Sequence, residues 1–205
     1  MVSDLRPQRI GRMLGSGKGS AMELGGKLLV AMPGMGDPRF EHSVVLICAH
    51  SDEGAMGLIV NKPNQDLSFS GLLDHLGIPC APDGRDIKVH FGGPVERGRG
   101  FVLHDLSYPR GEGSMTVPGG YGMTATLDIL EALAQGNGPE SALLALGYSG
   151  WGPGQLEAEI LRNDWLICDA RPDLVFAADD SGKWTASLKS MGIDPLTLSS
   201  QAGRA

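Results

Sequence analysis

The pentapeptide at residues 147–151 resembles the nucleophile elbow of serine hydrolases, in which the nucleophile stands between a strand and a helix. That elbow needs glycine two residues after the serine, because strand and helix pack too closely there for a side chain. Trp151 occupies this position after Ser149. We therefore expect a strand-to-helix turn in which the Ser149 hydroxyl bonds the backbone. A hydrolase that uses Ser43 or Ser149 with a histidine, such as His104, is kept as an alternative.

A second glycine-rich segment, at residues 15–20, contains a Gly-Lys pair like that of a phosphate-binding loop. Such a loop needs a glycine five positions before the pair, where Arg12 stands, and a serine or threonine after the lysine, where Gly19 stands. No apolar strand precedes the segment. Nucleotide binding is therefore not expected there.

The five histidines are dispersed along the chain, and none forms an HExxH motif or a close pair on a helix face. His90 and His104 could meet if their strands were neighbours, with Asp105 beside them. Ordinary histidines at strand edges explain the pattern better than a metal site. We expect neither a metal nor another cofactor.

Glycines and polar side chains gather at the ends of the predicted strands, and a pocket would form if these ends converge. Backbone amides would line this pocket, and the side chains of Trp151 and Gln155 would contact the ligand. The polar loop at residues 37–40 is either functional or a structural turn in which its aspartate caps backbone amides. The candidate binding residues are Asp37, Ser43, Asn61, Lys62, Gly92, Gly93, Ser149, Trp151 and Gln155.

The hydrophobic pattern predicts the elements that must position these residues. Strands are expected at residues 28–32, 43–50, 55–60, 87–91, 100–106, 114–117, 142–148 and 165–168. Helices are expected at residues 68–76 (with Ser68 as N-cap), 124–134, 154–163 and 183–191. The second and third strands should form a hairpin. Several strands follow one another without a helical crossover, which favours a mixed sheet of the α+β class.

Composition is that of a globular protein, with 41% hydrophobic and 20% charged residues among 205. We expect residues 1–26 to be a flexible basic leader and residues 27–205 to form a single domain. The three cysteines form no CxxC pair, which is typical of a reducing compartment. Neither a secretory hydrophobic region nor an apolar run long enough for a membrane span is present. These features predict a cytoplasmic protein without membrane association.

The net charge of −7 is opposite to that of a general nucleic-acid binder, whose affinity rests on phosphate contacts. The leader is an exception, because residues 1–27 hold five basic and two acidic side chains. A DNA-binding transcriptional regulator that acts through the leader is therefore a further alternative. No helix-turn-helix pattern with a basic recognition helix supports it, so nucleic acid is not the expected partner.

Four glycine-rich blocks, in this order, resemble the AlgH (YqgE) family over about residues 27–192. They are AMPGMGDPRF at 31–40 with SVV at 43–45; GAMGLIVNKP at 54–63; FGGPV at 91–95 with RGFVLH at 99–104; and LGYSGW at 146–151 with GQLE at 154–157 and NDWL at 163–166.

The resemblance implies a branched mixed sheet that includes a small β-barrel, with helices packed outside. It also implies a bacterial cytosolic protein of a kind sometimes labelled a transcriptional regulator. The family has no agreed catalytic residues, so none is carried over. We expect a non-enzymatic protein with a regulatory role that binds a small molecule or a protein partner, neither of which the sequence identifies.

Overall fold

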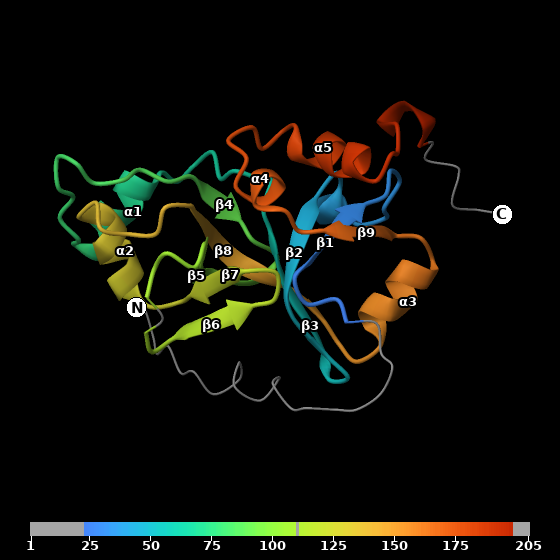
Figure 1. The fold of residues 1–205 in the computed structure, drawn as a ribbon, viewed down its shortest axis with the longest axis horizontal. Coiled ribbons are helices and arrows are strands. Elements are labelled where there is room, and N and C mark those ends of the chain that lie inside the picture. The colour runs from blue at the N-terminus through green and yellow to red at the C-terminus, as the bar shows by residue number, and fades with distance from the viewer. Residues whose placement is uncertain (1–22, 110, 199–205) are drawn as a thin grey trace.

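The computed structural model describes residues 23–109 and 111–198 of the chain. Nine strands of this part form one branched sheet, and helices pack against its outer faces (Figure 1). The strands are β1 (Lys27–Ala31), β2 (Val44–Ser51), β3 (Gly54–Ile59), β4 (Val89–Phe91), β5 (Val95–His104), β6 (Ser114–Val117), β7 (Tyr121–Thr124), β8 (Ala142–Trp151) and β9 (Trp165–Asp169).

The sheet branches at β8, which pairs with three other strands. The strand order is β6-β7-β5-β8-β3-β2-β1-β9, and β4 pairs with β8 outside this path. The β4–β8 pair is parallel and the other described pairs are antiparallel. The mixed α+β class is therefore confirmed. The small barrel implied by the resemblance is not closed by any pairing of the described strands, since β6 and β9 end the path; the sheet curls as an open half-barrel.

The helices cover the faces of this sheet (Figure 1). They are α1 (Phe69–Leu76), α2 (Leu127–Ala134), α3 (Gln155–Leu161), α4 (Pro172–Val175) and α5 (Lys183–Ser190), with the short 3-10 helices η2 (Pro38–Phe40) and η3 (Pro195–Thr197). The predicted N-cap of α1 is present, because the Ser68 hydroxyl accepts a hydrogen bond from the Gly71 amide at 3.1 Å. Buried residues of α1 and α2 pack with β4, β5 and β8, whereas those of α4 and α5 pack with β1 and β2.

A short strand and a one-turn helix were not predicted from the sequence, and two strands are longer than expected. Strand β5 begins at Val95 rather than at residue 100 and ends at His104. Strand β7 has four residues and one of them is Gly122, so its alternation is too brief to detect. Helix α4 is a single turn. Strand β8 continues past Tyr148 to Trp151, because its last residues pair with β3. Helix α2 starts at Leu127 rather than at residue 124, because Thr124 belongs to β7.

The branch at β8 depends on glycine, because the backbones approach too closely for a side chain. A Cβ atom on Gly92 would lie 2.3 Å from the Gly147 carbonyl oxygen. A Cβ atom on Gly93 would lie 2.2 Å from the Tyr148 carbonyl carbon. Gly147 itself has a φ of 72°, which favours glycine. These glycines let β4 and the turn after it lie against β8.

The central strands β1, β2 and β3 are buried on both faces, which explains their continuous apolar runs. One face packs with α5 through Trp184 and Leu188, and the other packs with α3 through Leu156. Of the predicted leader, only residues 23–26 are described. Leu24 is buried in the cluster beside α3, and the Gly26 amide donates to the Ile47 carbonyl at 2.8 Å.

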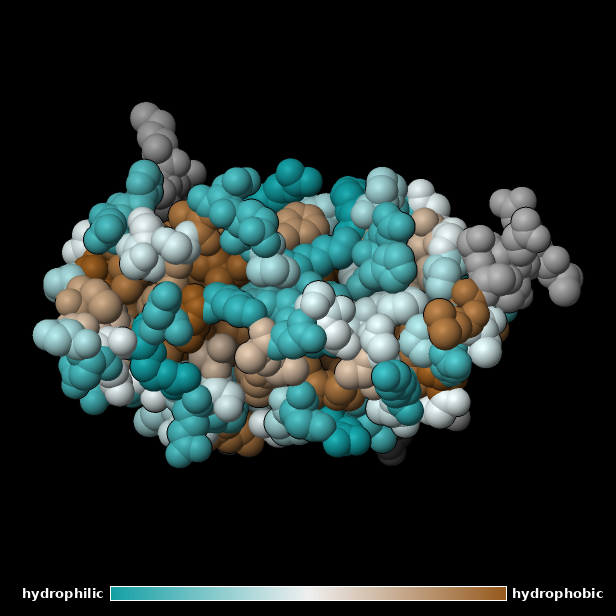
Figure 2. Space-filling view, turned by 90° about the horizontal axis from the view of Figure 1, so that it is seen from above, coloured by the Kyte–Doolittle hydropathy of each residue, from teal (hydrophilic) through white to brown (hydrophobic). Residues whose placement is uncertain are grey.

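The surface above α4 and α5 is mainly hydrophilic, with apolar residues visible between polar ones (Figure 2). No helix in the described ranges is long and apolar enough to cross a membrane. Cys48, Cys80 and Cys168 are free thiols. Burial raises the pKa of Cys48 to about 12, which keeps this thiol protonated and unreactive.

A buried ionic cluster holds the start of α5 against the sheet. The Lys183 ammonium donates to Asp180 Oδ1 at 3.0 Å and to the Val60 carbonyl at 2.7 Å. The side chains of Lys183 and Asp180 are only 2% and 6% exposed. The His90 ring lies 2.9 Å from Asp180 Oδ1 through Nε2. Burial alone would raise the pKa of Asp180, but its hydrogen bonds to Lys88, His90 and Lys183 outweigh burial and lower it to about 2.

Replacement Asp180→Asn should destabilise the protein strongly, because it leaves the Lys183 charge buried without a carboxylate. Breaking a buried pair in this way costs about 3–5 kcal/mol, measurable by denaturant unfolding at pH 7. Because the folded pKa of Asp180 is depressed, its contribution is complete above the unfolded value of 3.8 and is lost as pH falls through about 2. The difference between the wild-type protein and the variant should therefore shrink as the pH is lowered through this window.

Asp173→Asn is the matched control, because Asp173 forms an exposed pair with Arg171 in which both side chains are about 60% accessible. Its effect should stay within about 0.5 kcal/mol. Equal losses in the two variants would contradict a stabilising role for the buried cluster.

Candidate functional site

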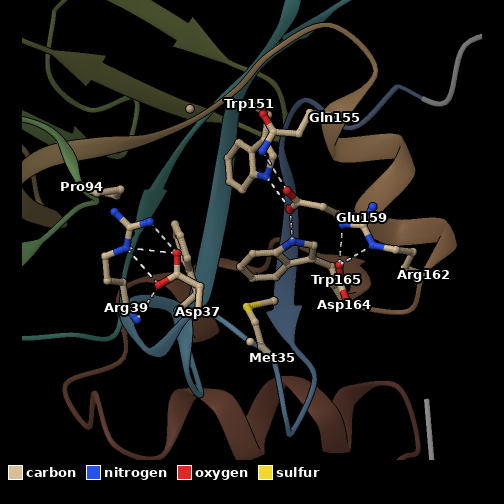
Figure 3. Close-up of a pocket in the computed structure, with 13 residues that line it drawn as sticks. Met35, Asp37, Arg39, Pro94, Trp151, Gln155, Glu159, Arg162, Asp164 and Trp165 are labelled. Carbon is tan, nitrogen blue, oxygen red and sulfur yellow. Dashed lines mark hydrogen bonds and ion pairs between the residues drawn. The ribbon is translucent and has the colours of Figure 1, made fainter. Parts of the chain in front are cut away.

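A cavity of about 250 Å³ lies between the loop after β1, the end of β8 and the segment formed by α3 and the start of β9. In Figure 3 the loop residues lie on one side of it, and the side chains of α3 and β9 lie on the other. Its aromatic lining residues are Phe40, Trp151 and Trp165. Its charged lining residues are Asp37, Arg39, Glu159, Arg162 and Asp164.

Asp37 shapes the loop side of the cavity. Its carboxylate caps η2 by accepting from the Arg39 amide at 3.0 Å. It also forms a two-point ion pair with the Arg39 guanidinium, at 2.9 Å to Nε and 2.6 Å to Nη2. The hydrogen bond from the Arg39 side chain holds the pKa of Asp37 below its usual value. The residue thus makes the predicted structural turn and also lines the cavity.

Two other candidate residues, Asn61 and Lys62, do not line the cavity. They stabilise the loop after β1 through hydrogen bonds. The Asn61 side chain accepts from the Val44 amide at 2.8 Å and donates to the His42 carbonyl at 2.9 Å. The Lys62 ammonium donates to the Arg39 carbonyl at 2.8 Å. Partial burial lowers the pKa of Lys62. Both residues follow β3, so the end of this strand positions the loop after β1.

The three aromatic rings that line the cavity pack against one another. The Phe40 and Trp151 rings are 6.5 Å apart between centroids and inclined by only 35°. Trp165 stands edge-on to both, at 78° to Phe40 and 76° to Trp151. Both tryptophans are largely buried, whereas Phe40 is half-buried. The rings come from three separate parts of the chain.

Glu159 on α3 fixes both indole rings. Its Oε2 atom accepts from Trp151 Nε1 at 2.9 Å and from Trp165 Nε1 at 2.9 Å (Figure 3). Its Oε1 atom accepts from Gln155 Nε2 at 2.9 Å, one helical turn away. Gln155 in turn accepts from the Gly152 amide at 3.0 Å. One carboxylate therefore links the end of β8, the start of β9 and the first turn of α3.

The cavity thus brings together three of the nine predicted binding residues, Asp37, Trp151 and Gln155. Gly92 and Gly93 do not contribute the expected amides, because they pack against β8. The Gly92 amide donates to the Leu146 carbonyl at 2.8 Å.

The serines lack the geometry that a hydrolase needs. Ser149 lies within β8, opposite Gly57, and not in the predicted turn, because pairing with β3 extends the strand. Its hydroxyl donates to the Gly92 carbonyl at 3.3 Å. The Ser43 hydroxyl has no hydrogen-bond partner among the described residues, and both side chains are fully buried. The nucleophile arrangement is therefore not formed.

The histidines that the sequence analysis considered are engaged elsewhere. His104 lies 2.9 Å from the Thr124 hydroxyl through Nε2 and 2.6 Å from the Asp105 carbonyl through Nδ1. His90 belongs to the buried cluster with Asp180. Strand β8 lies between the strands of these two histidines, so they do not form a pair. Within the described ranges, no three potential metal ligands gather.

Sequence reasoning missed Glu159 and Trp165, which complete the cavity. The signal available was the spacing of Gln155 and Glu159 on one helix face, flanked by two tryptophans. That spacing does not reveal that both indoles reach the same carboxylate. The other alternative, DNA binding through residues 1–26, stays a prediction, since residues 1–22 lie outside the described ranges.

The chain is similar in sequence to proteins of a known family. The family model described as AlgH-like matches residues 28–196. The chain belongs to the AlgH-like family. A UPF0301 protein of Cereibacter sphaeroides is 68% identical over 184 residues, which cover 90% of this chain and all of the relative. A UPF0301 protein of Bradyrhizobium diazoefficiens is 50% identical, with 91% of this chain and 90% of the relative covered. The predicted family is therefore confirmed.

Two solved structures are similar to the fold of this chain. The solution structure of the AlgH protein from Pseudomonas aeruginosa is similar with a TM-score of 0.72 and 36% identity, covering 93% of this chain and 100% of that one. A crystal structure of a Corynebacterium diphtheriae protein gives a TM-score of 0.65 at 21% identity, over 95% and 97% of the two chains. The latter match shows the fold alone.

Glu159→Ala should destabilise the protein and disturb the emission of Trp151 and Trp165. Each buried donor left without a partner costs about 1–3 kcal/mol, and two indole N–H groups lose their acceptor. Denaturant unfolding and tryptophan emission spectra measure the effects. Glu131→Ala on the exposed face of α2 is the control and should change stability by less than about 0.5 kcal/mol. Similar losses in both variants would contradict the role of Glu159.

A fluorophosphonate probe should label neither Ser43 nor Ser149, because both hydroxyls are buried and no described histidine bonds them. Mass spectrometry of the probe-treated protein checks this. Labelling of the wild-type protein that disappears in Ser43→Ala or Ser149→Ala would show that the inference is wrong.

Proposed function

We propose that this protein is a non-enzymatic binding protein that holds a small ligand in the aromatic cavity and thereby serves a regulatory role. The observation that carries the proposal is the convergence of Phe40, Trp151 and Trp165 around one cavity, with Glu159 holding the indoles in place. Concave sites lined by aromatic rings and a few convergent polar groups are typical of ligand pockets.

Preorganisation supports binding at this position. The loop side is fixed by the Asp37–Arg39 pair and by Lys62, and the helix side is fixed by Glu159. A ligand that enters therefore loses less free energy in ordering the site than it would in a flexible loop. The cavity is lined both by the loop after β1 and by α3. A bound ligand therefore contacts both segments at once.

The absence of a reactive pair in this cavity favours binding over catalysis. Its charged residues are ion-paired or held by hydrogen bonds, and neither Ser43 nor Ser149 lines it. We also propose that residues 27–205 form a single domain. We further propose that the protein is cytoplasmic, because its thiols are sparse and unpaired.

Intrinsic fluorescence tests the proposal directly. In Trp184→Phe, the remaining tryptophans are Trp151 and Trp165, both in the cavity. This protein is titrated at constant ionic strength with a panel of small fragments: tetramethylammonium, benzamidine, benzoate, phenyl phosphate and benzyl alcohol. At least one member should change the emission saturably.

The response should be lost when Phe40→Ala removes one of the three aromatic rings that line the cavity. Phe176→Ala is the matched control, because Phe176 is also half-buried but packs beside Tyr121, away from the cavity. The proposal is wrong if no fragment binds, or if binding survives Phe40→Ala unchanged.

A further inference from the structure

We infer that the ligand of this cavity is an organic cation, such as an ammonium or methylated ammonium group, seated against the indole rings. The inference rests on the proposed function and specifies the chemical class of the ligand. It stands on two independent observations, the balance of charges in the cavity and the arrangement of its aromatic rings.

The charges of the cavity leave one carboxylate uncompensated. Arg39 pairs with Asp37 at 2.6 Å, and Arg162 pairs with Asp164 at 2.9 Å. Glu159 forms no ion pair within the described residues, because its three donors are two indole N–H groups and the amide of Gln155. The lining residues therefore carry one negative charge more than positive charges.

Nearby cations do not correct this imbalance. The Lys62 ammonium donates to the Arg39 carbonyl and does not line the cavity, and the carboxylates that act on it are those of Glu41 and Asp37, not that of Glu159. An anionic ligand placed against the indoles would meet the field of Glu159 at partly buried depth, where like charges repel strongly. A cation at the same place would be attracted by the carboxylate without displacing any existing ion pair.

The aromatic rings add a second attraction for a cation. Trp is the best of the aromatic side chains for cation–π contacts, and several rings around one site recognise quaternary ammonium groups. Here three rings pack against one another, with centroids 5.6, 6.0 and 6.5 Å apart, and all three residues line the same cavity. Donation of both indole N–H groups to a carboxylate increases the electron density of the rings, which strengthens their attraction for a positive charge. The nearby Met35 thioether adapts to an irregular apolar surface.

Choline and its neutral carbon isostere, in which a tert-butyl group replaces trimethylammonium, separate charge from shape. Both are titrated into the Trp184→Phe protein at constant ionic strength. Choline should bind about tenfold or more tightly than the isostere, since a desolvated cation–π contact is worth up to about 2 kcal/mol and 1.4 kcal/mol is tenfold. Equal affinities would overturn the inference.

Glu159→Gln in the same background tests the carboxylate. The amide oxygen can still accept from the indoles, but the negative charge is gone. Choline affinity should fall about tenfold, as for the loss of roughly 1.4 kcal/mol, whereas affinity for the isostere should not change. Glu157→Gln is the matched control, because Glu157 lies on the same helix, pairs with His50 and does not line the cavity. Unchanged choline binding in Glu159→Gln would contradict the inference.

Failure of the inference and failure of the proposed function give different results. Saturable binding of benzoate or phenyl phosphate without binding of choline or tetramethylammonium would overturn the cation class and retain a binding function. Absence of binding by the whole panel and by choline would overturn both.

Discussion

The close approach of backbones at β8 is the constraint on which the rest of the structure depends. β8 meets β5 on one edge and both β4 and β3 on the other, so one strand carries the junction of the sheet. Gly92, Gly93 and Gly147 make this contact possible, because a side chain on any of them would overlap main-chain atoms. The junction extends β8 as far as Trp151, which delivers the indole to the cavity beside α3.

Charge is placed in this fold in two contrasting ways. In the cluster of Asp180, Lys183 and His90, opposite charges meet in the interior and join α5 to the sheet. At Glu159, by contrast, the donors that meet a partly buried carboxylate are all neutral among the residues that the structure describes. The first arrangement satisfies its charges internally and is structural. The second retains an unmatched charge beside aromatic surface, which is the property that points to an external partner.

Local features could be predicted from the sequence where neighbouring residues decide them. The Ser68 cap of α1 and the hairpin of β2 and β3 are of this kind, because a hydroxyl near a helix start and a short polar turn act over a few residues. Strand β7 and the true end of β8 could not be predicted, because pairing with distant strands determines them. Trp151 and Gln155 were predicted to contact a ligand in one pocket, whereas the approach of Asp37 to them and the role of Glu159 in linking Trp151 to Gln155 were not predicted.

The sequence by itself determined the family, the mixed α+β class and most of the elements, because apolar periodicity and glycine-rich turns are local signals. Only the tertiary structure decided what the glycines do: Gly92 and Gly93 admit a neighbouring backbone instead of offering amides to a ligand. It also decided that Ser149 is buried within a strand and that two indoles share one carboxylate. These features depend on contacts between segments far apart in the chain, whose register is set by the branching of the sheet and not by any short stretch of residues.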